Sequence, residues 1–152
     1  MSLPALYVFT TLTGYIIGLG GVTVVNLLGF LGRKNSYWTE IAIRSHKVMN
    51  VLIWIGISLK VLGEYFLYQS LGFPSISVLL FMISGFLIAN GCILSFYVSP
   101  RLVEREKEGR AAEVLPKKLR NLITVSFVVS FIGWWSSVLI SSWLIYLKIF
   151  EG

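Results

Sequence analysis

Apolar residues gather into four long stretches that are separated by short polar regions. The stretches are Leu3–Gly32, Val48–Tyr68, Phe73–Ser99 and Asn121–Leu147, and only the second contains charged residues. A helix needs roughly 20 apolar residues to cross a bilayer, because each residue advances it by about 1.5 Å. The pattern therefore predicts an all-α transmembrane four-helix bundle. We expect helices at 4–32, 44–68, 74–99 and 116–148, with cytoplasmic loops at 33–43 and 101–115.

Composition supports a membrane protein with no separate soluble domain. Apolar residues make up 56% and charged residues 13% of the 152 residues, against roughly 25% charged residues in soluble proteins. Four spans use nearly the whole chain, so we expect a single transmembrane domain over residues 1–152. The single cysteine, Cys92, excludes a CxxC redox centre, an internal disulfide and a thiolate metal cluster. We expect a protein that is not an enzyme.

The basic residues predict the orientation of the bundle. All but Lys60 and Lys148 of the thirteen Lys and Arg lie between the first and second stretches or between the third and fourth. Positive residues are retained on the cytoplasmic side, so we expect both termini on the outer side of the plasma (inner) membrane. The net charge of +6 would then meet anionic lipid headgroups at the cytoplasmic face. Because these residues flank the spans, we expect no nucleic-acid partner.

Stripes of small residues predict where the helices touch, since lipid provides no hydrophobic drive between helices. Small residues recur at helical spacing in the first, third and fourth stretches. The predicted packing positions are Gly14, Gly18, Gly21, Gly85, Ser126, Gly133 and Ser137. Gly14 and Gly18 form a GxxxG step, which also occurs in helix dimers, so a homo-oligomer or a membrane-protein partner stays open.

Lys60 and Glu64 are the only charged residues within the apolar stretches, and their spacing places them on one face of a helix. Counting inward from Lys47 puts them roughly 20 and 25 Å from the cytoplasmic edge. Ionisable groups at membrane depth are costly and are therefore functional candidates. One interpretation is an ion pair at the outer end of the bundle, near Tyr15 or Trp135. The other is a route for protons or ions, or a site for an anionic ligand.

A second group of polar residues lies nearer the cytoplasmic edge, at roughly 10–15 Å by the same count. Each helix contributes one member, and the set is Asn26, Trp54, Asn90 and Ser130. The pattern predicts one interhelical hydrogen-bond network, in which each bond contributes about 0.6 kcal/mol. A small ligand pocket at that depth is the alternative.

His46 is the single histidine, and it lies between Arg44 and Lys47 near the predicted start of the second helix. We expect an interfacial side chain. One histidine cannot supply bis-histidine haem ligation, and no Met or Cys at helical spacing completes a metal site. We therefore expect no metal and no cofactor.

Three segments resemble a family of small, largely uncharacterised prokaryotic four-helix membrane proteins. The segments are GLGGVTVVNLLGFL (18–31), ANGCILSFYVSPRL (89–102) and SFIGWWSSVLI (130–140), and IWIGI (53–57) fits the same pattern. The resemblance covers most of the chain and implies a four-helix membrane fold, with no established activity. Members usually carry an acidic residue where this chain has Asn26, so the resemblance implies that any ionic role there is missing.

Three functions remain open from the sequence. The leading hypothesis is a non-enzymatic interaction or accessory subunit, because the polar groups within the spans are few and are explained by packing. The first alternative is a small oligomeric transporter or ion-coupled permease that uses Lys60 and Glu64. The second alternative is a haem or redox membrane protein that uses His46.

Overall fold

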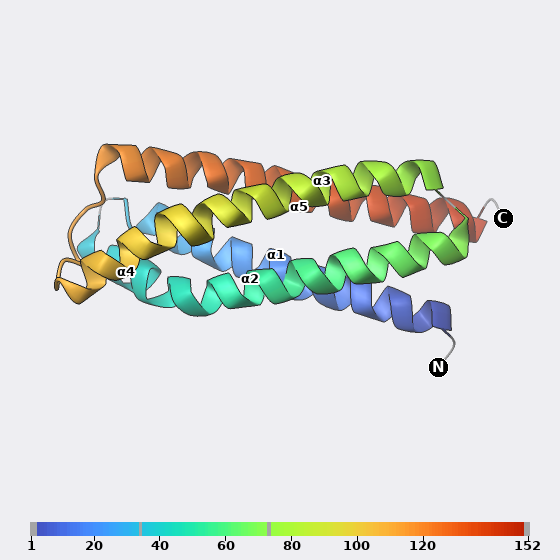
Figure 1. The fold of residues 1–152 in the computed structure, drawn as a ribbon, viewed down its shortest axis with the longest axis horizontal. Helices are drawn as coiled ribbons and strands as arrows, with labels where there is room; N and C mark the ends of the chain where they lie inside the picture. Colours follow the sequence, from blue (N-terminus) through green and yellow to red (C-terminus); the bar gives the residue numbers. More distant parts are fainter. Residues whose placement is uncertain (1–2, 34, 73, 151–152) are drawn as a thin grey trace.

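The computed structural model describes residues 3–33, 35–72 and 74–150, without the side chains of 74–76 and 148–150. The described chain is helical apart from its connections, and it contains α1 (Leu3–Leu31), α2 (Ser36–Leu71), α3 (Pro74–Cys92), the π-helix η1 (Ile93–Val98), α4 (Ser99–Lys107) and α5 (Lys117–Phe150). Because α3, η1 and α4 follow one another without a break, four rods lie lengthwise side by side (Figure 1). All four are long and apolar enough to cross a membrane. The predicted all-α transmembrane four-helix bundle is confirmed.

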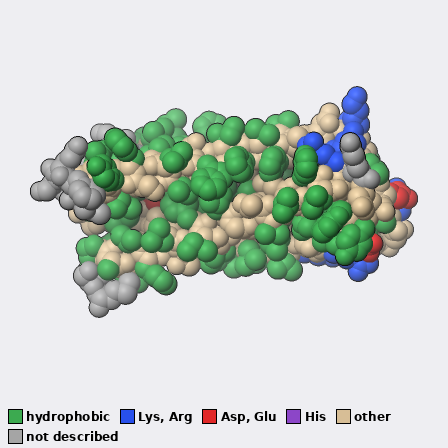
Figure 2. All heavy atoms as spheres, turned by 180° about the vertical axis from the view of Figure 1, so that it is seen from behind, with side chains coloured by type: hydrophobic (Ala, Val, Ile, Leu, Met, Phe, Trp, Pro, Cys, Tyr) green, Lys and Arg blue, Asp and Glu red, His purple; other side chains and the backbone are tan. Residues whose placement is uncertain are grey.

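The four rods close into a bundle. α1 contacts α2, α2 contacts α3, α3 contacts α5, and α5 contacts α1. The α1–α2 and α4–α5 connections lie at the same end, which we call the basic end, and both chain termini lie at the other (Figure 1). Figure 2 shows Lys and Arg side chains at the basic end and apolar side chains over the middle of the visible face.

The second helix is longer than predicted at both ends. The Asn35 side chain accepts a hydrogen bond from the Tyr37 N–H at 2.9 Å and caps the helix start. At the other end Gly72 has φ +73°, a left-handed conformation that favours glycine, and its N–H donates to the Tyr68 carbonyl at 3.1 Å. The predicted bounds of 44–68 were wrong because the polar first turns of α2 interrupt the apolar pattern.

The third rod also continues past its predicted end at residue 99, reaching Lys107. A proline removes one N–H and clashes with the carbonyl four residues earlier. Here the turn before Pro100 widens into η1, where the Ser99 N–H donates to the Leu94 carbonyl five residues back. The helix therefore passes Pro100 and extends the rod into the region predicted to be a loop. There Lys47 of α2 pairs with Glu106 of α4 at 2.8 Å.

Glycines bring α1 into close contact with its neighbours. A Cβ on Gly14 would lie 2.3 Å from the backbone nitrogen of Lys60, and a Cβ on Gly18 would lie 2.1 Å from the Trp134 ring. From the opposite side of this contact, a Cβ on Gly56 would lie 2.4 Å from the Gly18 Cα. No side chain fits at these positions, so backbone packs directly on backbone or ring.

Four of the five remaining predicted packing positions are buried or lie against a neighbouring helix, and one does not. A Cβ on Gly21 would lie 3.1 Å from Ile53, and one on Gly133 would lie 2.8 Å from Leu87. Ser126 and Ser137 are buried. Gly85 is different, because an added Cβ there meets no atom within 4 Å. The prediction that Gly85 marks a helix contact was wrong.

Candidate ionic network and ligand cavity

Lys60 and Glu64 lie in the interior of the bundle and have no exposed surface. The Lys60 Nζ lies 2.8 Å from Glu64 Oε2 and also donates to the Ser84 hydroxyl at 2.7 Å. The Tyr15 hydroxyl donates to Glu64 Oε1 at 2.5 Å. Both charges are therefore paired and hydrogen-bonded, which is the arrangement that makes a buried ion pair tolerable.

Two further side chains complete this network. The Ser141 hydroxyl donates to Glu64 Oε1 at 3.2 Å and accepts from the Tyr68 hydroxyl at 2.9 Å. We call the six residues the ionic network: Tyr15, Lys60, Glu64, Tyr68, Ser84 and Ser141. They come from α1, α2, α3 and α5, so the network links all four rods.

The structure corrects the expected surroundings of this pair. Tyr15 contacts it, but Trp135 does not belong to the network and is 43% exposed. Trp134 is the buried tryptophan, and its ring meets Tyr15 edge-on at a centroid distance of 6.2 Å. The sequence interpretation missed Tyr68 and Ser84, although Tyr68 lies one helical turn from Glu64 and therefore shares its face.

The predicted second network is two separate clusters instead of one. The Asn90 Nδ2 donates to the Ser130 hydroxyl at 2.8 Å and to the Ser126 carbonyl at 3.0 Å. Trp54 Nε1 donates to Ser95, which donates to the Asn50 side chain, both at 2.9 Å.

Asn26 joins neither cluster. Its Nδ2 is buried and has no hydrogen-bond partner within the described part of the chain. The expected single network, with one member from each helix, was therefore wrong. Sequence reasoning also missed Asn50 and Ser95, which form one of the two clusters.

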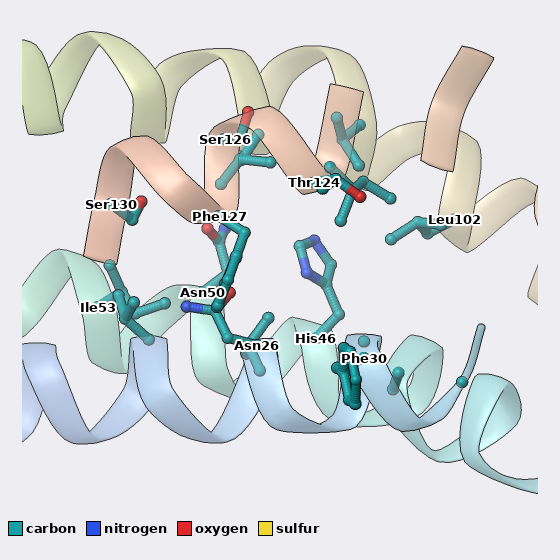
Figure 3. Close-up of a pocket in the computed structure, with 18 of the residues that line it drawn as sticks. Asn26, Phe30, His46, Asn50, Ile53, Leu102, Thr124, Ser126, Phe127 and Ser130 are labelled. Carbon is teal, nitrogen blue, oxygen red and sulfur yellow. The ribbon is translucent and has the colours of Figure 1, made fainter. Parts of the chain in front are cut away.

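A cavity of about 160 Å³ lies among the rods between the ionic network and the basic end. Its deep part is apolar and is formed by residues such as Val22, Ile57, Leu87 and Trp134. Its middle part carries the polar side chains Asn26, His46 and Asn50, which Figure 3 shows around the same space. Arg33, Arg120 and Thr124 line it toward the basic end, and Arg33 is exposed there.

His46, which was predicted to be an interfacial side chain, is buried and faces this cavity. It is only 9% exposed, and its ring projects into the space between the helices (Figure 3). Its Nε2 is buried without a hydrogen-bond partner in the regions described above. The sequence did not reveal this burial, because α2 begins at Ser36 and already extends about 15 Å before it reaches His46.

The described residues contain no cluster of three or more His, Cys, Asp or Glu side chains able to hold a metal ion. Cys92 is a free, partly buried thiol. The side chains that line the cavity can form hydrogen bonds and apolar contacts, and Arg33 and Arg120 bring positive charge toward the basic end. No family model, curated protein or solved structure matches this chain.

Proposed function

We propose that this protein is a non-enzymatic membrane subunit that binds a small molecule within the half of the bundle next to its basic end. The observation behind this proposal is the cavity into which His46 and Asn26 project with buried, unpartnered nitrogen atoms. Leaving a buried polar group unsatisfied costs about 1–3 kcal/mol. A ligand with a hydrogen-bond acceptor would remove that cost for the Asn26 Nδ2, which is a donor.

The proposal includes an orientation. Positive residues are retained in the cytoplasm, and the exposed Arg33, Arg44 and Arg110 all lie at the basic end. We place this end in the cytoplasm, next to anionic headgroups of the plasma (inner) membrane, with both termini outside. The cavity then faces the cytoplasmic side.

The other half of the bundle serves as a rigid frame in this proposal. Lys60 and Glu64 form an ion pair with each other, and the α1–α2 contact at Gly14 leaves no room between the two backbones. Neither Lys60 nor Glu64 lines the cavity. Their arrangement supports a structural role more directly than a transport route.

A substitution that fills the cavity tests the proposal. Gly29 lines the cavity, and an added Cβ there meets no atom within 4 Å. Gly20 has the same open surroundings but lies outside the cavity lining, so it supplies a matched control. We expect small molecules extracted from purified wild type and Gly20→Leu to include a compound that is depleted in Gly29→Leu. Mass spectrometry of the extracts measures this, and identical extracts from all three proteins would contradict the proposal.

An ion-coupled transporter is a second candidate. A smaller cavity of about 80 Å³ is lined by Tyr15 and Ser141, which both belong to the ionic network. Water or ions in this cavity would contact groups bonded to Glu64. Ion flux in proteoliposomes that contain the protein tests this candidate. If the candidate is right, Lys60→Met and Glu64→Gln each abolish that flux. Unchanged flux in both variants would exclude it.

A haem function through His46 is less well supported. Ligand sites for drug-sized molecules enclose roughly 300–1,000 Å³, whereas this cavity encloses about 160 Å³. A porphyrin does not fit that space without separating the helices. A Soret absorbance band in the purified protein would contradict this conclusion.

A further inference from the structure

The charges around the cavity define the class of molecule that it accepts, provided that the cavity binds a ligand as proposed above. No acidic residue of the described chain lines it, whereas Arg33 and Arg120 do. We propose that the ligand is a small amphipathic organic anion. Its acidic group lies at Arg33 and Arg120, its apolar body points toward Trp134, and an acceptor on that body meets His46 and Asn26.

Four other basic residues at the same end pair with carboxylates, whereas the two arginines that line the cavity do not within the described residues. Arg44, Lys47, Arg105 and Arg110 each pair with a glutamate. Within the described residues, Arg33 and Arg120 form no such pair. Arg33 instead donates one bond to the Thr124 hydroxyl at 3.0 Å, which joins the end of α1 to α5 beside the cavity. Arginine binds carboxylates and phosphates through several N–H groups in one plane, so donors remain for a ligand.

The polar groups lie at two depths, which sets the shape of the ligand. Arg33 lies seven positions after Asn26, in the turn just beyond the end of α1, which is about 10 Å farther along the chain at helical rise. Asn26 and His46 lie at about the same level of the bundle, because Gly21 of α1 faces Ile53 of α2 and Gly32 faces Thr39 on either side of them. Both line the cavity, as do Phe30 and Phe127 (Figure 3). A molecule that satisfies both depths has an acid group at one end and an acceptor farther along an apolar body.

The volume limits the size of this apolar body. An engineered cavity of about 150 Å³ in another protein binds benzene, and this one measures about 160 Å³. It therefore takes roughly one aromatic ring or a short aliphatic chain, while the acid group lies at the open mouth. Such an anion can come from the cytoplasm as a free acid, or from the membrane as an anionic lysophospholipid whose acyl chain extends out of the cavity between the helices.

A pair of photoreactive probes tests the proposal. In 4-acetylbenzoate, a photoreactive aryl ketone, one aromatic ring joins a carboxylate to a ketone acceptor, and 4-acetylbenzamide is its neutral counterpart. Both are added to the full chain in phosphatidylcholine vesicles, irradiated, and mapped by peptide mass spectrometry. We expect the anion to label cavity-lining peptides about 10-fold more than the amide, which corresponds to about 1.4 kcal/mol.

Variants assign this selectivity to the two arginines. Arg33→Gln with Arg120→Gln brings the anion-to-amide ratio to about one. Arg33→Lys with Arg120→Lys retains a ratio well above one, and so does Arg44→Gln, a control at the same end that does not line the cavity. Size-exclusion elution confirms that each variant is folded, and the lysine variant shows that loss of selectivity follows charge.

The outcomes distinguish this inference from the function on which it rests. Equal labelling of the cavity by both probes overturns the anion proposal and leaves a ligand cavity. Labelling by neither probe overturns both. Among competitors, displacement by benzoate supports a water-soluble acid, and displacement by lysophosphatidic acid added to the vesicles supports a lipid. If neither displaces 4-acetylbenzoate, the anion site is overturned.

Discussion

Lys60 and Glu64 are fully buried, and each is the only ion-pair partner of the other within the described residues. Removing one member of a buried pair leaves an uncompensated charge and costs about 3–5 kcal/mol, whereas removing both often costs little. We expect Lys60→Met to lower the free energy of unfolding by about 3 kcal/mol. Adding Glu64→Gln should recover at least half of that loss, since glutamine still accepts a hydrogen bond from Tyr15. Denaturant unfolding in mixed micelles, followed by tryptophan fluorescence, measures both.

The matched control is Lys47→Met. Lys47 also pairs with a glutamate at 2.8 Å, but its side chain is 52% exposed, and exposed pairs contribute little. We expect unfolding of this variant to match wild type. A double variant as unstable as Lys60→Met alone would show that the pair is not a mutually dependent unit.

Single residues differ in how far the sequence reveals their position. Lys60 and Glu64 stand out because charge is rare within an apolar run, and their spacing predicts that they share a face. Ser84 and Ser141 do not stand out, because serines occur throughout these helices as packing residues. Their bonds to Lys60 and Glu64 depend on the rotation of α3 and α5, which local sequence does not determine.

At the level of the helices, the contact between α1 and α2 depends on the absence of side chains. A Cβ at position 56 would meet the backbone of Gly18 at 2.4 Å, so the two helices must separate to accept it. Overpacking of this kind costs about 1–3 kcal/mol. We expect Gly56→Ala to destabilise the bundle by that amount in the same unfolding measurement.

Gly85→Ala supplies the comparison for this prediction. An added Cβ there meets no atom within 4 Å, and alanine is the better helix former by about 1 kcal/mol. The variant should be as stable as wild type or more so. Equal destabilisation of Gly56→Ala and Gly85→Ala would mean that close packing at Gly56 is not the cause.

The helices show why membrane sequences predict elements better than faces. The number of helices followed from length and hydropathy alone. The side of each helix that faces the other helices did not, because lipid and the bundle core are both apolar. Gly85 therefore has the same sequence signature as Gly133. The start of α2 was missed for a related reason, since the polar residues from Ser36 to Lys47 form helix without adding hydropathy. For the same reason the sequence did not reveal that His46 is buried among the helices.

Along its axis the bundle has two different halves. In the half that contains the ionic network, which we call the locked half, the four rods meet through that network and through glycine contacts. In the half next to the basic end, the same rods enclose a cavity with polar groups at two depths. The rigid half would hold the helix ends of the other half apart, so that a binding site persists without a ligand. This arrangement suits a binding subunit better than a carrier that must open on both sides.

Cysteine labelling from each side of the membrane tests this division together with the orientation. In a Cys92→Ser background, a membrane-impermeant thiol reagent should reach Leu3→Cys in intact cells and Arg110→Cys only in inside-out vesicles. His46→Cys should react in inside-out vesicles, because the cavity reaches the basic end. Glu64→Cys should react from neither side, since its position is fully buried. Labelling of Arg110→Cys in intact cells would reverse the orientation, and fast labelling of Glu64→Cys from outside would show that the locked half opens.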